Sequence, residues 1–173
     1  MGTTENLTGT DLGGLTLTPG VYTFDSSASL TGALGLDFGG LSNESFVFQT
    51  GSTLTTASAS MVNLLNEGTN DSVYWVVGSS ATLGTTTAFE GTLIADQSIT
   101  MDTDATIGCG AAIALNAAVT LDTNTIGGGC AAGDSTGTPV APSPTPEPSS
   151  LVLLGTGLFG AANMLWKRRR TIA

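Results

Sequence analysis

Short stretches of alternating apolar and polar residues recur along the chain, and helical periodicity is nearly absent before residue 150. Residues 12–24 alternate around a Pro-Gly turn, and residues 28–38 repeat the alternation. Nearly continuous apolar runs follow at 46–49, 73–77 and 89–95. Alternation is typical of half-buried strands, and short apolar runs are typical of buried ones. The pattern predicts an all-β domain of many short strands.

One four-residue phrase, threonine–apolar–variable–threonine, occurs four times and begins at Thr53, Thr82, Thr100 and Thr120. Self-similarity at roughly 20 residues, with one short strand per copy, is typical of solenoids. Within a strand, the apolar residue of each copy points inward and the threonine before it points outward. Stacked coils are therefore expected to set these four threonines in one outward column, with neighbours about 4.8 Å apart.

The distribution of charge excludes several classes of function. The 173-residue chain has no histidine, and its four basic residues lie together at Lys167, Arg168, Arg169 and Arg170. Nucleic-acid binding and adsorption of the domain to an anionic membrane surface both need cations that residues 1–166 lack. The same absence excludes a serine triad, a zinc site with imidazole ligands and a P-loop lysine. We predict no nucleic-acid partner, no metal and no cofactor.

Two cysteines, Cys109 and Cys130, are separated by about one coil. Adjacent coils bring such residues within reach of a disulfide, which requires Cα atoms about 4.4–6.8 Å apart. A disulfide here would imply an oxidising compartment. Two buried small residues are the alternative interpretation.

The composition changes sharply after the β domain. Five of the six prolines lie between residues 139 and 148, which predicts an extended linker over 133–148. An uncharged apolar run then predicts a transmembrane helix over 150–166, closed by the basic stop at 167–170. The positive-inside rule places the basic end in the cytoplasm and the preceding domain outside.

This tail, residues 149–173 with the tripeptide before it, resembles the PEP-CTERM sorting signal. The resemblance rests on Pro146, Glu147 and Pro148, followed by the apolar segment and the basic cluster. It implies recognition by an exosortase and processing near the Pro-Glu-Pro motif. It also implies export to the cell surface or extracellular matrix, with the helix as a transient or permanent membrane anchor.

The body of the chain resembles the microbial ice-binding-protein-like β-solenoid domain, many members of which are antifreeze proteins. The segments that carry the resemblance are 12–22, 47–56, 74–78, 89–95 and 120–126. The resemblance implies a right-handed β-solenoid of triangular cross-section, with a helix alongside in complete members. We assign residues 1–132 to this domain and expect its N-terminal part to be missing. An open flank of the solenoid is then expected to expose apolar side chains.

Ice binding needs a flat, rigid surface without mobile charges, and threonine supplies a methyl group, an anchoring hydroxyl and few rotamers. The resemblance implies a Thr-Ala/Gly-x-Thr/Asn pattern whose first position falls on Thr56, Thr85, Thr103 and Thr123. Asp104 departs from that pattern, and its hydration shell is expected to weaken contact with ice. The predicted ice-binding residues are Thr53, Thr56, Thr82, Thr85, Thr100, Thr103, Thr106, Thr120, Thr123 and Thr125.

Catalysis and calcium binding are two alternatives. Asp102 and Asp122 occupy equivalent positions on consecutive coils, and carboxylates about 5–5.5 Å apart carry out retaining glycoside hydrolysis. No neighbouring residue is expected to give these two carboxyl groups different pKa values, as an acid–base pair requires. We therefore expect both aspartates to lie at a solvated edge, and we predict no enzyme. Asp102, Asp104 and Asp122 also offer the oxygen ligands that Ca²⁺ prefers, although no EF-hand or Asp-rich repeat accompanies them.

The third alternative is a non-catalytic adhesin or structural protein of an exopolysaccharide matrix, because fold does not determine function. The sorting tail favours it, since that tail concerns export rather than cold. Glu90 and Trp75 form a candidate carbohydrate-binding pair. We expect them instead to be a turn residue and a core aromatic.

Overall fold

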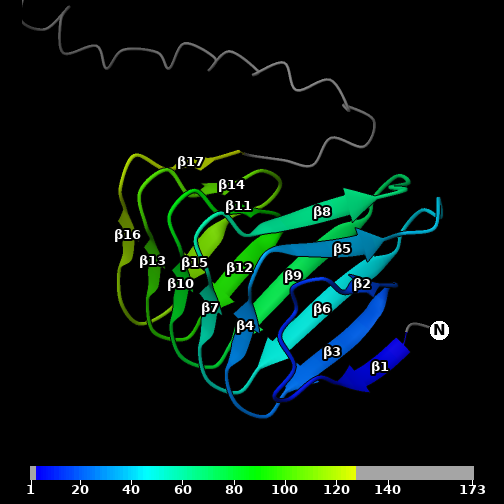
Figure 1. Cartoon of the computed structure of the whole chain (residues 1–173), viewed down its shortest axis with the longest axis horizontal. Helices are drawn as coiled ribbons and strands as arrows, with labels where there is room; N and C mark the ends of the chain where they lie inside the picture. The colour runs from blue at the N-terminus through cyan, green and yellow to red at the C-terminus, as the bar shows by residue number, and fades with distance from the viewer. Residues whose placement is uncertain (1–2, 128–173) are drawn as a thin grey trace, which may run out of the picture. The chain divides into compact units, whose positions relative to one another are not determined.

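The computed structural model describes residues 3–127 (Figure 1). The predicted linker, transmembrane helix, Pro-Glu-Pro motif and basic stop lie outside these residues, as does Cys130. Within residues 3–127, no helix is long and apolar enough to cross a membrane. The described elements are all β-strands, as the alternation of the sequence predicted.

Three parallel sheets share residues 3–127 (Figure 1). Sheet A consists of β1 (Thr3–Asn6), β3 (Gly20–Phe24), β6 (Ser45–Thr50), β9 (Ser72–Val77), β12 (Thr92–Ala95) and β15 (Ala112–Ala114). Sheet B consists of β4 (Ala28–Leu30), β7 (Leu54–Thr56), β10 (Ala81–Leu83), β13 (Ile99–Met101) and β16 (Val119–Leu121). Sheet C consists of β2 (Thr16–Leu17), β5 (Ala33–Asp37), β8 (Met61–Leu65), β11 (Ala88–Phe89), β14 (Thr106–Ile107) and β17 (Thr125–Ile126).

From β3 onward, the chain passes through the sheets in the order A, B, C and then begins the next coil. Each strand pairs in parallel with the corresponding strand of the coil before or after it. Parallel strands joined by such a coiled path are the arrangement of a β-solenoid. This confirms the predicted all-β, parallel-stranded class.

Alternation decides which side chains enter the core. In the three-residue strands β4, β7 and β10, the first and third side chains are buried and the second points outward. The inward positions are mostly leucine, isoleucine, methionine and alanine, which suit a narrow interior. Each coil therefore presents one outward residue at the centre of its sheet B strand.

Aromatic residues, most of them on sheet A, stack inside the solenoid. The rings of Phe48 and Trp75 stack with centroids 3.9 Å apart. Tyr22 stacks on Phe48 at 5.3 Å, and Phe89 lies 4.8 Å from Trp75. The indole Nε1 of Trp75 donates a 2.9 Å hydrogen bond to the carbonyl oxygen of Glu90, which lies in the turn between β11 and β12. Trp75 is therefore a core aromatic and Glu90 a turn residue, as predicted.

The corner between sheets B and C repeats one backbone conformation in successive coils. Ala59, Thr86, Asp104 and Thr123 occupy it with φ angles of 56°, 57°, 58° and 56°. A left-handed conformation costs a residue other than glycine about 1–3 kcal/mol, so it persists only where the surrounding fold imposes it. Because this conformation recurs, the chain leaves sheet B through the same turn in four coils.

Exposed apolar side chains occur in the last coil and on the outer face of sheet A. Leu121 and Ile126 are in register with the buried Met101 and Ile107, yet they are 52% and 38% exposed. No further coil covers them within residues 3–127. On sheet A, the outward residues Tyr74, Val76 and Ile113 are also exposed.

Candidate functional site

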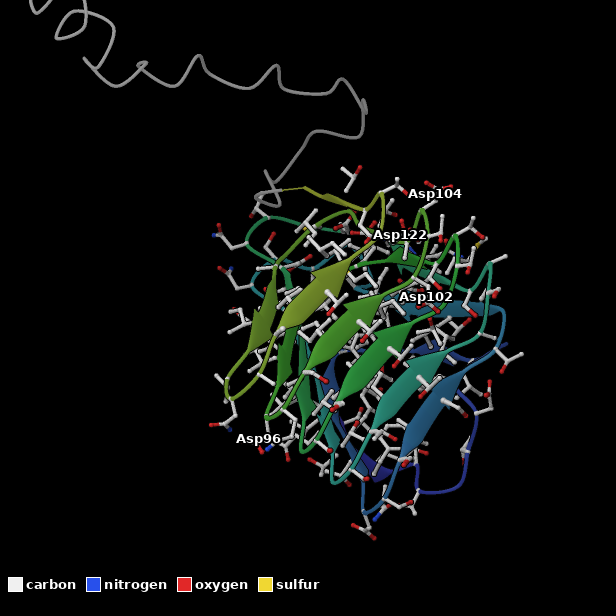
Figure 2. The ribbon with its side chains drawn as sticks, turned by 90° about the vertical axis from the view of Figure 1, so that its left-hand side faces the viewer. Asp96, Asp102, Asp104 and Asp122 are labelled. Atoms are coloured by element: carbon white, nitrogen blue, oxygen red, sulfur yellow. The ribbon has the colours of Figure 1, made fainter. Side chains whose placement is uncertain are left out.

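The outer face of sheet B carries one column of hydroxyl-bearing residues along its centre. Strand register aligns Ser29 of β4 with Thr55, Thr82, Thr100 and Thr120 of the four strands that follow. Neighbouring rows of a sheet are about 4.8 Å apart, so the side chains form a regular line. Figure 2 shows this face turned toward the viewer, with the strands side by side. We call Thr55, Thr82, Thr100 and Thr120 the threonine column.

The register corrects the predicted column at its first member. Thr82 pairs with Thr55 and not with Thr53, because the inward Leu54 aligns with Ala81. Thr53 precedes β7, and its hydroxyl lies 2.9 Å from that of Ser27. The prediction aligned the phrases by their first threonine, which placed this copy two residues out of register. The apolar residue before each central threonine was the signal that would have aligned them.

Thr56 also occupies a different place from the one predicted, because its side chain points into the core. It is 3% exposed and aligns with the inward Leu83. Its hydroxyl lies 2.8 Å from that of Thr87 and accepts a 2.9 Å hydrogen bond from the backbone N–H of Gly84. A side chain in this position does not reach a surface ligand.

The hydroxyl groups of the threonine column have no hydrogen-bond partner within residues 3–127. Thr82 and Thr100 are half-buried between neighbouring rows, while Thr55 and Thr120 are exposed. β-Branching leaves each side chain few χ1 states. Ser29, at the head of the column, differs because it donates a 2.7 Å hydrogen bond to the carboxylate of Asp11. The column therefore offers four ordered hydroxyl groups that remain free to bind water.

A second line of hydroxyl groups runs along the side of sheet B where its strands begin. The hydroxyls of Ser27 and Thr53 lie 2.9 Å apart, and Ser98 donates a 3.0 Å hydrogen bond to Ser80. These pairs join consecutive coils just ahead of the strands. They restrict the side chains beside the threonine column, so this margin of the face is rigid.

Carboxylates gather at the opposite margin, where the sheet B strands end. Figure 2 shows Asp102, Asp104 and Asp122 near the arrowheads of the strands. The hydroxyl of Thr103 donates to Asp122, and that of Thr123 donates to Asp104 at 3.0 Å. The predicted site residues Thr103 and Thr123 are therefore engaged with carboxylates at the corner. Thr85 lies in the equivalent corner of an earlier coil, and its hydroxyl has no partner among the described residues.

Thr106 and Thr125 lie on a different face. They pair with each other in β14 and β17, which belong to sheet C. The structure therefore does not bring them together with the threonine column. Of the ten predicted residues, the column contains Thr82, Thr100 and Thr120, and the sequence interpretation missed Thr55.

The three aspartates at the strand ends do not form an arrangement that holds a metal ion. Within residues 3–127, no group of three or more histidine, cysteine or acidic side chains is placed to bind one. Asp104 and Asp122 instead accept hydrogen bonds from threonines of the neighbouring coil. These hydrogen bonds join the corner of one coil to the corner of the next.

Asp11 closes the first coil at the head of the threonine column. Burial alone would raise the pKa of its carboxyl group, but hydrogen bonds from Ser29, Gly13 and Thr31 outweigh burial and hold that pKa below its ordinary value. The carboxylate thus satisfies groups that would otherwise need another coil. Elsewhere in the solenoid, Cys109 is disulfide-bonded. The chain contains one other cysteine, Cys130, which lies outside the described residues.

Comparison with known proteins identifies two parts of the chain. A family model described as Ice-binding-like matches residues 1–127, and a PEP-CTERM protein-sorting motif matches residues 144–170. An ice-binding protein of Nostoc sp. (strain HG1) is 52% identical over 167 residues, covering 96% of this chain and 60% of that protein.

Solved structures agree with the sequence comparison. A crystal structure of an ice-binding protein from the Antarctic ascomycete Antarctomyces psychrotrophicus is 45% identical, with a TM-score of 0.66, covering 70% of this chain and 60% of that one. An ice-binding protein from an Antarctic biological consortium is 43% identical, with a TM-score of 0.66 and coverages of 73% and 57%. The chain thus spans less than two thirds of each of these relatives. Because the first family model matches most of its residues, the chain belongs to the Ice-binding-like family.

Proposed function

We propose that this chain binds ice, or orders water in an ice-like arrangement, through the threonine column on the outer face of sheet B. The observation that carries the proposal is the alignment of Thr55, Thr82, Thr100 and Thr120 at one position of four consecutive strands, with their hydroxyl groups unpartnered. Membership of the Ice-binding-like family supports it.

The chemistry of these side chains suits an ordered solid surface. Each threonine methyl group excludes mobile water, and each hydroxyl anchors one ordered water molecule. The strand spacing repeats this pair of groups about every 4.8 Å. Residues 1–166 contain no lysine, arginine or histidine, so no long cationic side chain disturbs the face. Binding of this kind requires no catalytic step.

The hydrogen bonds of the residues that border the threonine column limit the extent of the proposed site. We assign the centre of the site to Thr82 and Thr100, flanked by Thr55 and Thr120. Thr85 extends the site toward the corner. Thr53, Thr103 and Thr123 border the site, because their hydroxyl groups already have protein partners. Asp102 and Asp122 limit the site, since a carboxylate holds its own hydration shell.

For the rest of the chain we propose export and surface display. The match to the PEP-CTERM motif supports sorting by an exosortase-type enzyme, with residues 150–166 as a transient or permanent membrane anchor. The right-handed, triangular form of the solenoid is part of the same proposal. The three-sheet order of the coils supports the triangular form.

Inhibition of ice recrystallisation tests the site. The full chain is compared with the double variant Thr82→Lys/Thr100→Lys, and with Thr106→Lys/Thr125→Lys as a matched control on sheet C. We expect the sheet B variant to need at least about tenfold more protein for the same inhibition, because lysine ammonium groups must lose water at the ice surface. The sheet C variant should match the wild type. Equal activity of the sheet B variant, with an unchanged melting temperature, would exclude this face.

A further inference from the structure

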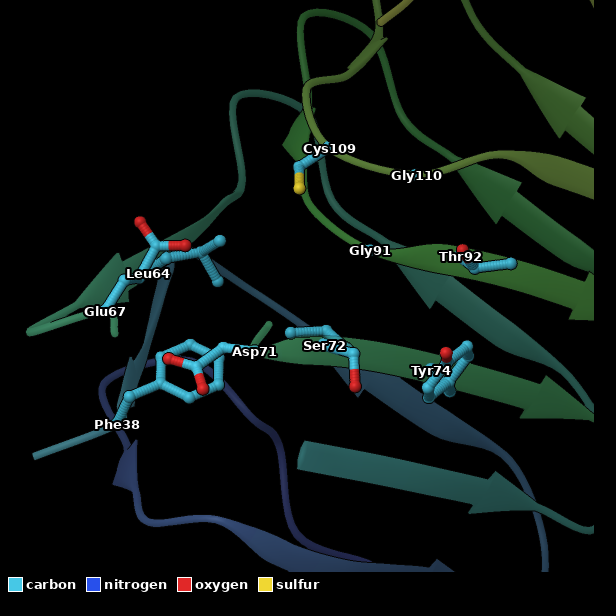
Figure 3. A pocket seen from close by; sticks show the side chains of 11 residues that line it. Phe38, Leu64, Glu67, Asp71, Ser72, Tyr74, Gly91, Thr92, Cys109 and Gly110 are labelled. Carbon is cyan, nitrogen blue, oxygen red and sulfur yellow. The ribbon is translucent and has the colours of Figure 1, made fainter. Parts of the chain in front are cut away.

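A pocket opens at the corner between sheets C and A, away from the threonine column (Figure 3). Its volume is about 310 Å³, within the range of about 300–1,000 Å³ that small-molecule sites occupy. Phe38, Leu64 and Val73 supply apolar surface. Glu67, Ser72 and Thr92 supply polar groups around it.

The pocket exists because successive coils turn this corner with connections of different length. Residues 66–71 join β8 to β9, whereas residues 90–91 alone join β11 to β12. The longer connection projects beyond the next coil and leaves a hollow beneath it. Gly91 allows the short turn, since its φ of 99° is left-handed and an added Cβ would lie 2.7 Å from the Val73 side chain.

The projecting wall of the pocket is rigid. Its connection stacks on residues 37–44 of the preceding coil, where Asn66 donates a 2.8 Å hydrogen bond to Asp37 and Thr69 donates a 3.0 Å bond to Ser42. The two carboxylate oxygens of Asp71 accept hydrogen bonds from the backbone N–H groups of Glu44 and Gly68. A preformed wall lowers the entropy cost of binding a ligand.

Three polar groups of the lining remain available to a ligand. The carboxylate of Glu67 and the hydroxyls of Ser72 and Thr92 have no hydrogen-bond partner within residues 3–127. Asp71 is already satisfied, and the carboxyl group of Glu90 beside the pocket accepts the backbone N–H of Cys109. The pocket therefore presents one free carboxylate with two hydroxyl groups.

These groups define the chemistry of the ligand. A carboxylate only accepts hydrogen bonds, so the ligand must donate them. Residues 1–166 contain no basic side chain, so an anionic ligand finds no counter-charge. A cation is better served by several free carboxylates, and only Glu67 is free here. A neutral polyol matches the two hydroxyl groups, and the exposed ring of Tyr74 offers a surface for its C–H face.

We propose that this pocket binds a short segment of a neutral saccharide chain, because its polar groups are spread from Glu67 past Ser72 to Thr92 and Tyr74 (Figure 3). Glu67 accepts hydrogen bonds from sugar hydroxyl groups, Ser72 and Thr92 exchange hydrogen bonds with others, and Tyr74 packs against the sugar ring. Burial, and then the nearby charge of Asp71, raise the pKa of Glu67, which agrees with a carboxyl group in a partly dry pocket. The pocket and the threonine column lie on separate faces, so a bound glycan leaves the proposed ice face open.

Isothermal titration of the full chain with cellotetraose and maltotetraose tests the proposal. We expect one of these neutral tetrasaccharides to bind with a dissociation constant in the range of about 1 mM, as suits a small open site. Glu67→Ala and the double variant Ser72→Ala/Thr92→Val should each weaken binding about tenfold. The matched control Glu5→Ala removes an exposed carboxylate from β1 and should bind like the wild type.

Trigalacturonate and glucosamine serve as the anionic and cationic probes. Binding of only a charged probe would overturn the proposal, as would the absence of binding by both neutral tetrasaccharides. Undiminished binding by folded Glu67→Ala and Ser72→Ala/Thr92→Val would overturn the assigned site. The Thr82→Lys/Thr100→Lys variant should bind the saccharide normally, which separates this result from the test of ice binding.

Discussion

The hydroxyl oxygens of Thr56 and Thr87 lie 2.8 Å apart inside the solenoid, in a position that leucine or methionine fills in neighbouring coils. The Thr56 hydroxyl also accepts the N–H of Gly84, and Thr87 donates a 3.2 Å hydrogen bond to the carbonyl oxygen of Ala57. The pair therefore ties β7 to the corner of the following coil, directly behind the outer face of sheet B.

Removal of the Thr56 hydroxyl tests this link. Thr56→Val keeps the shape of the side chain but leaves the buried N–H of Gly84 without a partner, so we expect a loss of about 1–3 kcal/mol in the free energy of unfolding. Thr55→Val, one residue earlier and outward, should stay within about 0.5 kcal/mol of the wild type. Denaturant titration measures both.

A double-mutant cycle then isolates the pair. Thr56→Val/Thr87→Val should cost less than the sum of its single changes, because the two hydroxyl groups partner each other. Strict additivity would show that the link contributes nothing of its own.

The turn carboxyl group of Glu90 predicts a pH dependence of stability. Burial, and to a smaller degree the charge of Glu67, raise the pKa of Glu90, although the N–H of Cys109 opposes this shift. An acid with a raised folded pKa binds its proton more tightly in the folded state. Its stabilising contribution is full below the unfolded pKa of about 4.3 and is lost as the pH rises through the folded value.

Glu90→Gln should therefore match the wild type near pH 3.5 and melt a few degrees higher at pH 7. The glutamine carbonyl oxygen can still accept the N–H of Cys109. Thermal unfolding of both proteins at the two pH values checks the difference. A lower melting temperature for the variant at pH 7 would contradict the assigned sign.

The aromatic stack carries much of the stability of the middle coils. Trp75 is 1% exposed and stacks on Phe48, so Trp75→Ala should cost about 3–5 kcal/mol in the free energy of unfolding. Tyr74→Ala, at the preceding position of the same strand, removes a ring that is 42% exposed and should cost far less. Similar losses of unfolding free energy in the two variants would contradict the assignment of Trp75, rather than Tyr74, to the core.

The carboxylate of Asp102 limits the proposed ice face, and its removal should increase activity. Asp102 follows β13 as Gly84 follows β10, and small residues at this position leave the margin of the face uncharged. We expect Asp102→Ala to inhibit ice recrystallisation at a severalfold lower concentration. Glu5→Ala, which removes one charge from sheet A, should leave the activity unchanged. Reduced activity of folded Asp102→Ala would mean that the carboxylate contributes to binding.

The strands of the solenoid could be predicted because their inward positions are apolar and recur at every second residue. The apolar runs at 46–49 and 73–77 lie within β6 and β9, and the alternation of 28–38 became β4 and β5. Burial of every second residue leaves an alternation of apolar and polar residues that can be recognised from the sequence alone. The resemblances to the Ice-binding-like family and to the PEP-CTERM motif are likewise confirmed.

The register of the threonine column was harder to predict for a physical reason. Threonine is small and carries both a methyl and a hydroxyl group, so it suits an outward position, a hydrogen-bonded corner and a satisfied interior site. Thr55, Thr53 and Thr56 occupy these three environments within four residues. The composition of such a segment does not distinguish them, whereas the inward Leu54 does.

The saccharide pocket could not be derived from local pattern at all. It results from the difference in length between the connection of residues 66–71 and that of residues 90–91 in the next coil. That difference becomes a hollow only when the coils are stacked in register. The residues that line it come from five separate parts of the chain.

Direct adsorption to ice tests the central claim. The fluorescently labelled full chain is presented to a single growing ice crystal, alongside Thr82→Lys/Thr100→Lys and the sheet C control Thr106→Lys/Thr125→Lys. We predict that the wild type and the control coat the crystal surface and that the sheet B variant does not. A wild type that leaves the ice bare, or a folded sheet B variant that coats it equally, would contradict the assignment of ice binding to the threonine column.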